Sequence, residues 1–241
     1  MRKIYSSAVL LMMLLASCVG GLFNKTIHGN GNLKSEERNI NSADRIKSYG
    51  NFDIVIVQGP TASVKIEADE NLMPYILTQN ENGALVIKTK ENYNLSSDNK
   101  IKVTVTTSQL EELELAGSGN VNGEGKFTGK DHLKISVAGS GDVTLNVNTP
   151  EIDSHIAGTG NITLSGETKD SKIEIAGVGN YTAESLMSEN VKIHIAGSGN
   201  AKVYAENNLD IHIAGSGDVY YRGNASVKQD IAGSGKISKE Q

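Results

Sequence analysis

One pentapeptide, Ala-Gly-x-Gly followed by Asn, Asp or Lys, occurs seven times between residues 116 and 236 of this chain. The copies occupy residues 116–120, 138–142, 157–161, 176–180, 196–200, 214–218 and 232–236. Successive copies start 18 to 22 residues apart. A turn motif with a period of about 20 residues is typical of a solenoid, in which each coil buries its apolar face against its neighbours. The repeat therefore constrains the architecture strongly and the activity weakly.

The residues before each copy alternate between apolar and polar side chains. The position just before the alanine is always branched and apolar: Leu115, Val137, Ile156, Ile175, Ile195, Ile213 and Ile231. The positions between these apolar residues are mostly polar, as at Glu174 and His194. This period of two predicts a half-buried strand. A second short strand is expected after each copy, with the inward column Val121, Val143, Ile162, Tyr181, Ala201, Val219 and Ile237.

The paired glycines predict a tight corner between these strands, because glycine adopts positive φ at little steric cost. The repeat turns are therefore assigned to Gly117, Gly119, Gly139, Gly141, Gly158, Gly160, Gly177, Gly179, Gly197, Gly199, Gly215, Gly217, Gly233 and Gly235. The small alanine is expected to let the chain turn close to the core. The Asn or Asp is expected to bond its own backbone or to stack on its copies in adjacent coils.

These patterns predict an all-β fold, a parallel β-helix of about seven coils. Stacked strands about 4.8 Å apart would make the regular part roughly 30–35 Å long. No stretch between the copies has sustained helical spacing. The chain contains 3 Pro, no Trp and 5% aromatic residues, which indicates a narrow aliphatic core.

The first residues have the pattern of a bacterial lipoprotein signal peptide, assigned to 1–17. Arg2 and Lys3 precede a short apolar stretch that is too short to span a bilayer. It ends in Leu-Ala-Ser before Cys18, the only cysteine in the chain. We therefore predict lipidation of Cys18, with the acyl chains buried in a membrane. The alternative is an ordinary secretory signal with an incidental cysteine.

This signal implies a location in the cell envelope, lipid-anchored at the outer membrane of a Gram-negative bacterium and outside the cytoplasm. Removal of residues 1–17 takes away two cations and no acid, so the formal net charge moves from −5 to −7. Nucleic acid is an unfavourable partner for such an acidic chain. Residues 18–40, which include a Gly-Asn-Gly-Asn run, are expected to form a tether.

Residues 41–241 are interpreted as one domain. Its regular repeats cover 116–241. Residues 41–115 also contain alternating segments but lack the pentapeptide, so we expect irregular coils that cap the first edge of the solenoid. A short helical piece is expected around Leu72–Leu77.

The motif order resembles a known family. It comprises F-D-I-V-I-V-Q-G at 52–59, E-A-D-E-N-L at 67–72, G-A-L-V-I at 83–87, I-K-V-T-V-T at 101–106 and then the repeated pentapeptide. These residues resemble the putative auto-transporter adhesin, head GIN domain family of bacterial secreted proteins, over about residues 40–240. The resemblance implies a right-handed parallel β-helix and a cell-surface adhesin, with no catalytic residues to carry over.

Two patterns raise the question of a metal. Calcium prefers several converging hard oxygens, but only Asp142 and Asp218 are acidic in the column after the glycines. We therefore favour an amide ladder there. His194 and His212 lie on adjacent coils near Glu174, an arrangement that can hold a transition metal. We favour a solvated face of mixed charge, and no cofactor is expected.

Two classes of function remain. The favoured one is a non-catalytic adhesin or scaffold surface. Its partner is a glycan, an envelope component or another protein. A homo-oligomer is compatible with this function. Its polar columns offer Lys172, Lys192, His194 and His212 as the binding face. The alternative is a polysaccharide lyase or hydrolase, which needs clustered carboxylates with a cation. The acids here are scattered, and Arg222 is the only arginine of the repeats.

Overall fold

The computed structural model describes residues 24–128 and 131–240, and nearly all of its regular structure is β-strand. The expected helical piece is a single 3₁₀ turn, Met73–Tyr75 (η2). The strands are Lys25–His28 (β1), Leu33–Arg38 (β2), Arg45–Gly50 (β3), Asp53–Gln58 (β4), Ser63–Asp69 (β5), Ile76–Glu81 (β6), Ala84–Thr89 (β7), Tyr93–Ser96 (β8), Lys102–Thr107 (β9), Glu112–Gly117 (β10), Val121–Thr128 (β11), His132–Gly139 (β12), Asp142–Asn148 (β13), Glu151–Gly158 (β14), Asn161–Gly177 (β15), Asn180–Gly197 (β16), Asn200–Tyr204 (β17), Asn208–Gly215 (β18), Val219–Arg222 (β19), Ser226–Gly233 (β20) and Ile237–Lys239 (β21).

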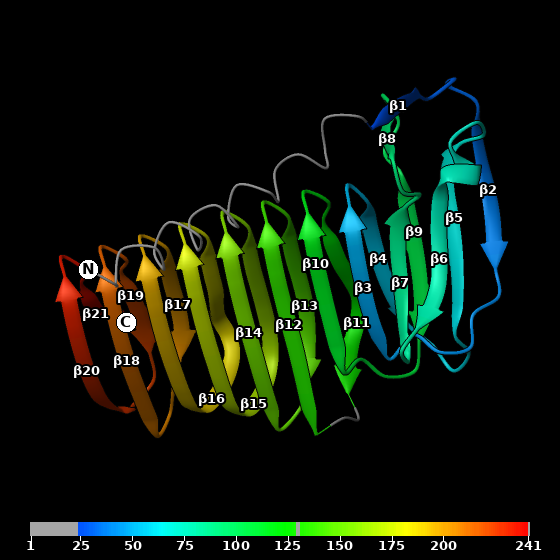
Figure 1. Cartoon of the computed structure of the whole chain (residues 1–241). Helices are drawn as coiled ribbons and strands as arrows, with labels where there is room; N and C mark the ends of the chain where they lie inside the picture. The colour runs from blue at the N-terminus through cyan, green and yellow to red at the C-terminus, as the bar shows by residue number, and fades with distance from the viewer. Residues whose placement is uncertain (1–23, 129–130, 241) are drawn as a thin grey trace, which may run out of the picture.

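The strands stack in parallel into a β-solenoid, which confirms the predicted architecture (Figure 1). We call the strands that end at the pentapeptide the upstream sheet: β10, β12, β14, the second halves of β15 and β16, β18 and β20. The strands that follow the pentapeptide form the downstream sheet: β11, β13, the first halves of β15 and β16, β17, β19 and β21. The strand pairings place identical motif positions beside one another, as at Ala176 and Ala196.

The core lies between the two sheets and follows the predicted columns. The residues before the alanines and the inward residues of the downstream strands are buried, except at the last coil, where Ile231 and Ile237 are only partly buried. The alanines themselves differ from the expectation. They point outward, and Ala157 and Ala176 are exposed, because the alternation of the strand continues through them before the corner begins.

Residues 41–115 cap one end, as expected, but they do so with antiparallel strands. The upstream sheet continues through β3 and β7 and ends in antiparallel β6. The downstream sheet continues through β4 and β9 and ends in antiparallel β5 and β2. The Arg38 guanidinium of β2 donates to the Met73 and Ile76 carbonyl oxygens, so it links the outer strands of the two sheets.

Two parts of the range predicted as a tether, residues 18–40, form strands. Residues 25–28 form β1, which pairs with β8, and residues 33–38 form β2, which pairs with β5. The composition misled the prediction because β2 is a polar edge strand with little buried surface. Cys18 and the predicted signal peptide lie outside the described residues. In the part of the chain that is described, no helix has the length and hydrophobicity needed to cross a bilayer.

The structure adds a corner that the sequence did not reveal. Tyr49-Gly50-Asn51-Phe52-Asp53 joins β3 to β4 and pairs in register with the first pentapeptide, Gly50 lying beside Gly117. Gly50 has φ +137°, close to the +140° of Gly117. Phe52 takes the place of the second glycine and is buried. This degenerate copy joins the cap to the regular repeats.

Candidate functional site

The Asn and Asp residues that follow the glycines form one continuous ladder along the downstream sheet. It begins at Asp53, which accepts from the Asn120 side-chain amide, and Asn120 Oδ1 in turn accepts from the Asp142 backbone N–H at 3.2 Å. Asp142 Oδ1 accepts from both the backbone N–H and Nδ2 of Asn161, at 3.2 and 2.7 Å. The same pattern continues through Asn180, Asn200 and Asp218 to the Lys236 backbone N–H.

The ladder confirms the predicted stacking and explains why the column is mainly amide. Each side-chain oxygen accepts a hydrogen bond from the backbone N–H or the side-chain amide of the next rung. Both Asn and Asp can supply this oxygen. Two Asp residues never occupy neighbouring rungs: Asn120 separates Asp53 from Asp142, and three Asn separate Asp142 from Asp218. Like charges at one-coil spacing are thereby avoided. The carboxylates do not converge as a calcium site requires.

A shallow groove of about 560 Å³ runs beside this ladder on the downstream sheet. One wall is the ladder from Asp142 to Asp218. The other is the neighbouring outward column, in which Thr144, Thr163, Thr182, Lys202 and Tyr220 succeed one another in register. The Lys202 ammonium lies over the Tyr220 ring, 5.6 Å from its centroid.

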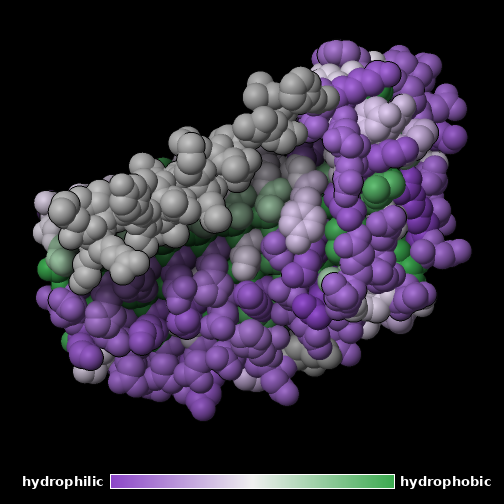
Figure 2. Space-filling view, viewed as in Figure 1, coloured by the Kyte–Doolittle hydropathy of each residue, from purple (hydrophilic) through white to green (hydrophobic). Residues whose placement is uncertain are grey.

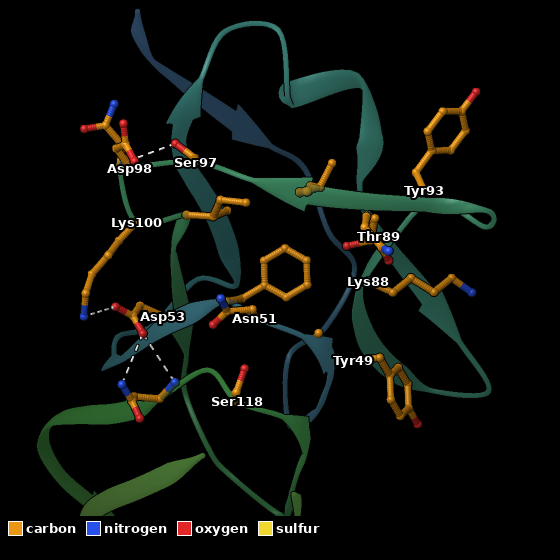
Figure 3. Close-up of a pocket in the computed structure, with 17 residues that line it drawn as sticks. Tyr49, Asn51, Asp53, Lys88, Thr89, Tyr93, Ser97, Asp98, Lys100 and Ser118 are labelled. Carbon is orange, nitrogen blue, oxygen red and sulfur yellow. Dashed lines mark hydrogen bonds and ion pairs between the residues drawn. The ribbon is translucent and has the colours of Figure 1, made fainter. Parts of the chain in front are cut away.

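A pocket of about 800 Å³ lies where the cap meets the first corner. Its walls come from the β3–β4 corner, the end of β7, β8 with the loop that follows it, and Ser118 and Asn120 of the first pentapeptide. Tyr49, Lys88 and Tyr93 lie on one side of it, and Asp53, Asp98 and Lys100 lie on the other (Figure 3). Its walls thus combine aromatic, amide, hydroxyl and charged groups.

The charged groups in this pocket are held by neighbours. Asp53 lies 2.7 Å from the Lys100 ammonium and also accepts from Asn120, so the pocket contains the first rung of the ladder. Lys88 forms an ion pair of 2.8 Å with Glu81, and the hydrogen bond to that carboxylate raises the pKa of Lys88. Tyr93 packs against Tyr75, with ring centroids 4.6 Å apart.

Buried Asp69 fixes the loop after β8 in place. Its carboxylate accepts from the Ser97 hydroxyl and, at 2.8 Å, from the Asn99 side chain. These hydrogen bonds, the Ser97 one foremost, lower the pKa of Asp69. Ser97 and Asn99 both line the pocket, so a carboxylate outside the pocket positions part of its rim.

The predicted binding face lies on the upstream sheet, and Figure 2 shows a broad hydrophilic region with a hydrophobic strip beside it. His155, Glu174, His194, His212 and Asp230 succeed one another in register, as the column predicted. The rings of His194 and His212 have centroids 6.5 Å apart, and His212 lies 3.3 Å from Asp210. The face is therefore a mixed-charge network.

Glu174 links the lysine and histidine columns of that face. It lies 2.7 Å from Lys172 and 3.0 Å from His155, and the Lys172 hydrogen bond is the main cause of its lowered pKa. Lys192 lies beside Lys172 in register and has no ion pair among the described residues. Lys172 and Lys192 thus share one column, while His194 and His212 share the next.

A different group brings three candidate ligand atoms close together. Among the described residues, ligand atoms of His132, Glu151 and Asp153 lie within 4.8 Å of one another, and His132 Nε2 is 3.2 Å from Asp153 Oδ2. In the described part of the chain, His194 and His212 form no such group with a third ligand. The sequence pattern did not reveal this trio, because His132 and its register partner Glu151 lie at the start of their strands and Asp153 stands two positions further along.

Among the described residues, the carboxylates that line the groove are Asp142 and Asp218, with the rungs Asn161, Asn180 and Asn200 between them. The pocket's two carboxylates are Asp53, which is committed to Lys100 and Asn120, and Asp98. Arg222 lies away from both, 3.6 Å from Glu184 and from Glu240. The arrangement offers hydrogen bonds and aromatic contacts on a rigid support.

The comparisons with known proteins agree with this architecture. The family model described as putative auto-transporter adhesin, head GIN domain, matches residues 43–225. A crystal structure of a putative lipid binding protein from Parabacteroides distasonis is 29% identical, with a TM-score of 0.74 over 90% of this chain and 100% of that chain. A putative adhesin from Bacteroides fragilis is 21% identical, with a TM-score of 0.81 over 89% of this chain and 100% of that chain. No functionally curated protein matches.

Proposed function

This chain belongs to the putative auto-transporter adhesin, head GIN domain family, and we propose that it is a non-catalytic binding protein of the bacterial cell envelope. Its primary site is the pocket between the cap and the first corner. The structural neighbours described as putative adhesins and as a putative lipid binding protein support a binding role for this fold. One of these descriptions names lipids as a ligand class to test, and the amide and hydroxyl groups of the pocket make glycans the second class.

The composition of the pocket is the observation that carries this proposal. Neutral hydrogen-bonding side chains of Asn51, Asn94 and Asn99 line it together with Tyr93 and Leu95. Mixed aromatic and amide walls with a few fixed polar groups are typical of ligand sites. Asp53 is ion-paired with Lys100, and Asp98 is the second carboxylate among the lining residues, so a turnover test on the same ligands must distinguish binding from hydrolysis.

A binding and turnover experiment on the same ligands tests the proposal. The full chain carrying Cys18→Ser would be screened against bacterial envelope fractions, purified glycans and phospholipid vesicles. We expect saturable binding that Tyr93→Ala and Asn99→Ala each weaken, with no change in the ligand. The exposed Lys126→Ala variant, distant from the pocket, is the control. Release of glycan fragments by the wild type would instead support the enzyme.

We further propose that the protein is anchored by lipid at Cys18 and faces away from the cytoplasm. The support is the sequence pattern before this cysteine, the only one in the chain. A diacyl anchor would bury enough hydrocarbon for stable attachment. Metabolic labelling with a palmitate analogue should mark the wild type and not Cys18→Ser, which should move to the soluble fraction. Unlabelled wild type would contradict the anchor.

A further inference from the structure

We propose that the groove on the downstream sheet binds a linear, uncharged glycan whose chain runs along the solenoid axis, with about one sugar ring to each coil. This inference rests on the proposed binding function and names the class of ligand. It concerns a surface that the sequence analysis did not select, since the predicted binding face lies on the upstream sheet.

Unused hydroxyl groups are the first support. Thr144, Thr163 and Thr182 lie side by side in register. Their side-chain hydroxyls make no hydrogen bond with any residue that the structure describes. Each hydroxyl can both donate and accept, as sugar hydroxyls require. The three threonines therefore offer a ligand one hydrogen-bond donor and one acceptor site in each coil.

The amide ladder supplies a second row of donors next to the first. The Nδ2 of Asn180 uses one N–H on Asn161 Oδ1, and Asn161 and Asn200 make the equivalent bond to the rung before each of them. An amide nitrogen carries two N–H groups, so one remains for a ligand on each rung. Because both rows are tied to the strand backbone, little conformational entropy is lost on binding.

The charge distribution selects an uncharged ligand. The middle rungs Asn161, Asn180 and Asn200 and the three threonines are all neutral. The carboxylates of Asp142 and Asp218 stand at the two ends, and Lys202 is the one cation among the described residues that line the groove. A polyanion would meet two carboxylates and a single ammonium group, an unfavourable balance. Neutral hydroxyl-rich polymers match the walls.

The spacing selects a polymer. Neighbouring strands lie about 4.8 Å apart. A β-1,4-linked pyranose ring advances its chain by a similar distance, so successive rings meet equivalent groups on successive coils. The ladder also runs without interruption through Asn120 and Asp53 into the pocket at the cap. A long chain can thus follow the groove toward that pocket.

The test measures the affinity of neutral β-1,4-linked oligosaccharides of glucose, mannose and N-acetylglucosamine, in length series from disaccharide to hexasaccharide. We expect the affinity to rise with each added sugar ring. A ring that is already bound holds the next ring close to the next coil, so each added ring forms further contacts. Replacing Thr144, Thr163 and Thr182 together by Val keeps the β-branched shape and removes three hydroxyls. Each hydroxyl lost should weaken binding about threefold to tenfold.

Thr104→Val is the matched control, because Thr104 stands in the same outward column but lies outside the groove, beside Val55. Lys172→Gln with Lys192→Gln tests the upstream face. Circular dichroism and melting would verify the fold of every variant. The proposal is overturned if no oligosaccharide binds, if the triple variant binds as well as Thr104→Val, or if only acidic oligosaccharides bind. If binding to envelope fractions or vesicles is retained in those cases, the proposed binding function would remain supported and only the glycan proposal for the groove would be rejected.

Discussion

At the scale of single residues, the two glycines of each corner are required for different reasons. Gly177 has φ +133°, a backbone conformation that residues with a side chain rarely adopt. Gly179 has no such φ, but a methyl group there would overlap the carbonyl oxygen of Gly160 on the preceding coil. The first glycine is needed for backbone geometry as well as space, and the second for space alone.

This distinction predicts an order of stability for three variants. Gly83→Ala places a methyl group in open space at φ +79° and should cost about 1 kcal/mol. Gly179→Ala forces a backbone shift and should cost about 1–3 kcal/mol. Gly177→Ala combines strain and overlap and should cost most. Urea unfolding of the three variants would give the order, and equal midpoints would contradict the two separate roles.

Because of Asp69, we expect the cap to lose stability at acidic pH. Hydrogen bonds from Ser97 and Asn99 lower its pKa in the folded state. Its contribution to stability is therefore complete above the unfolded value, about 3.9, and is lost as the pH falls toward the folded value. Melting temperatures between pH 7 and pH 3 should fall more for the wild type than for Asp69→Asn. Parallel curves would show that this carboxylate does not contribute.

At the scale of elements, a large core side chain of one sheet packs against small core side chains of the other. Tyr181 of the downstream sheet is completely buried, and its hydroxyl lies against Ser154 and Ser171 of the upstream sheet. Burial raises the pKa of Tyr181, so the phenol stays protonated. Both serines occupy positions where most other coils have branched apolar residues. The small side chains make room for the large ring.

This pairing predicts that the substitutions are not additive. Ser154→Ile restores the repeat consensus but overpacks the space held by Tyr181, and should cost about 1–3 kcal/mol. Tyr181→Val leaves a cavity and should also destabilise. Together they restore the usual column sizes, so the double variant should be more stable than the sum of the two changes predicts. Additive free energies of unfolding would mean that the two positions do not share space.

The sequence predicted the regular elements because every coil repeats the same burial. Ile175 and Ile195 are buried as their column required, and the pentapeptides stack as expected. It did not reveal the corner at Tyr49-Gly50-Asn51-Phe52-Asp53, because β5 to β9 separate this copy from the next. It also missed the cap pocket, whose walls come from segments distant in sequence, and it did not identify the groove as a site.

At the scale of the whole molecule, the two ends of the solenoid differ (Figure 1). Antiparallel β2, β5 and β6 close the end near the cap. At the other end, β20 pairs with β18 and β21 pairs with β19, and no described strand pairs with their outer edges. Val227, Ile231 and Ile237 are only partly buried there. An open edge of this kind can add strands from another copy.

Lysines at this open edge should therefore keep the protein from associating end to end. Charged side chains, lysine above all, are a common defence of exposed edge strands. Lys228→Thr with Lys239→Thr removes two of these charges and raises β-propensity, so the variant should show concentration-dependent association in sedimentation experiments. Lys172→Thr with Lys192→Thr changes charge and composition identically on the upstream face and should not. Association of both variants to the same extent would attribute the effect to net charge, and a monomeric edge variant would show that the lysines are not what protects the edge.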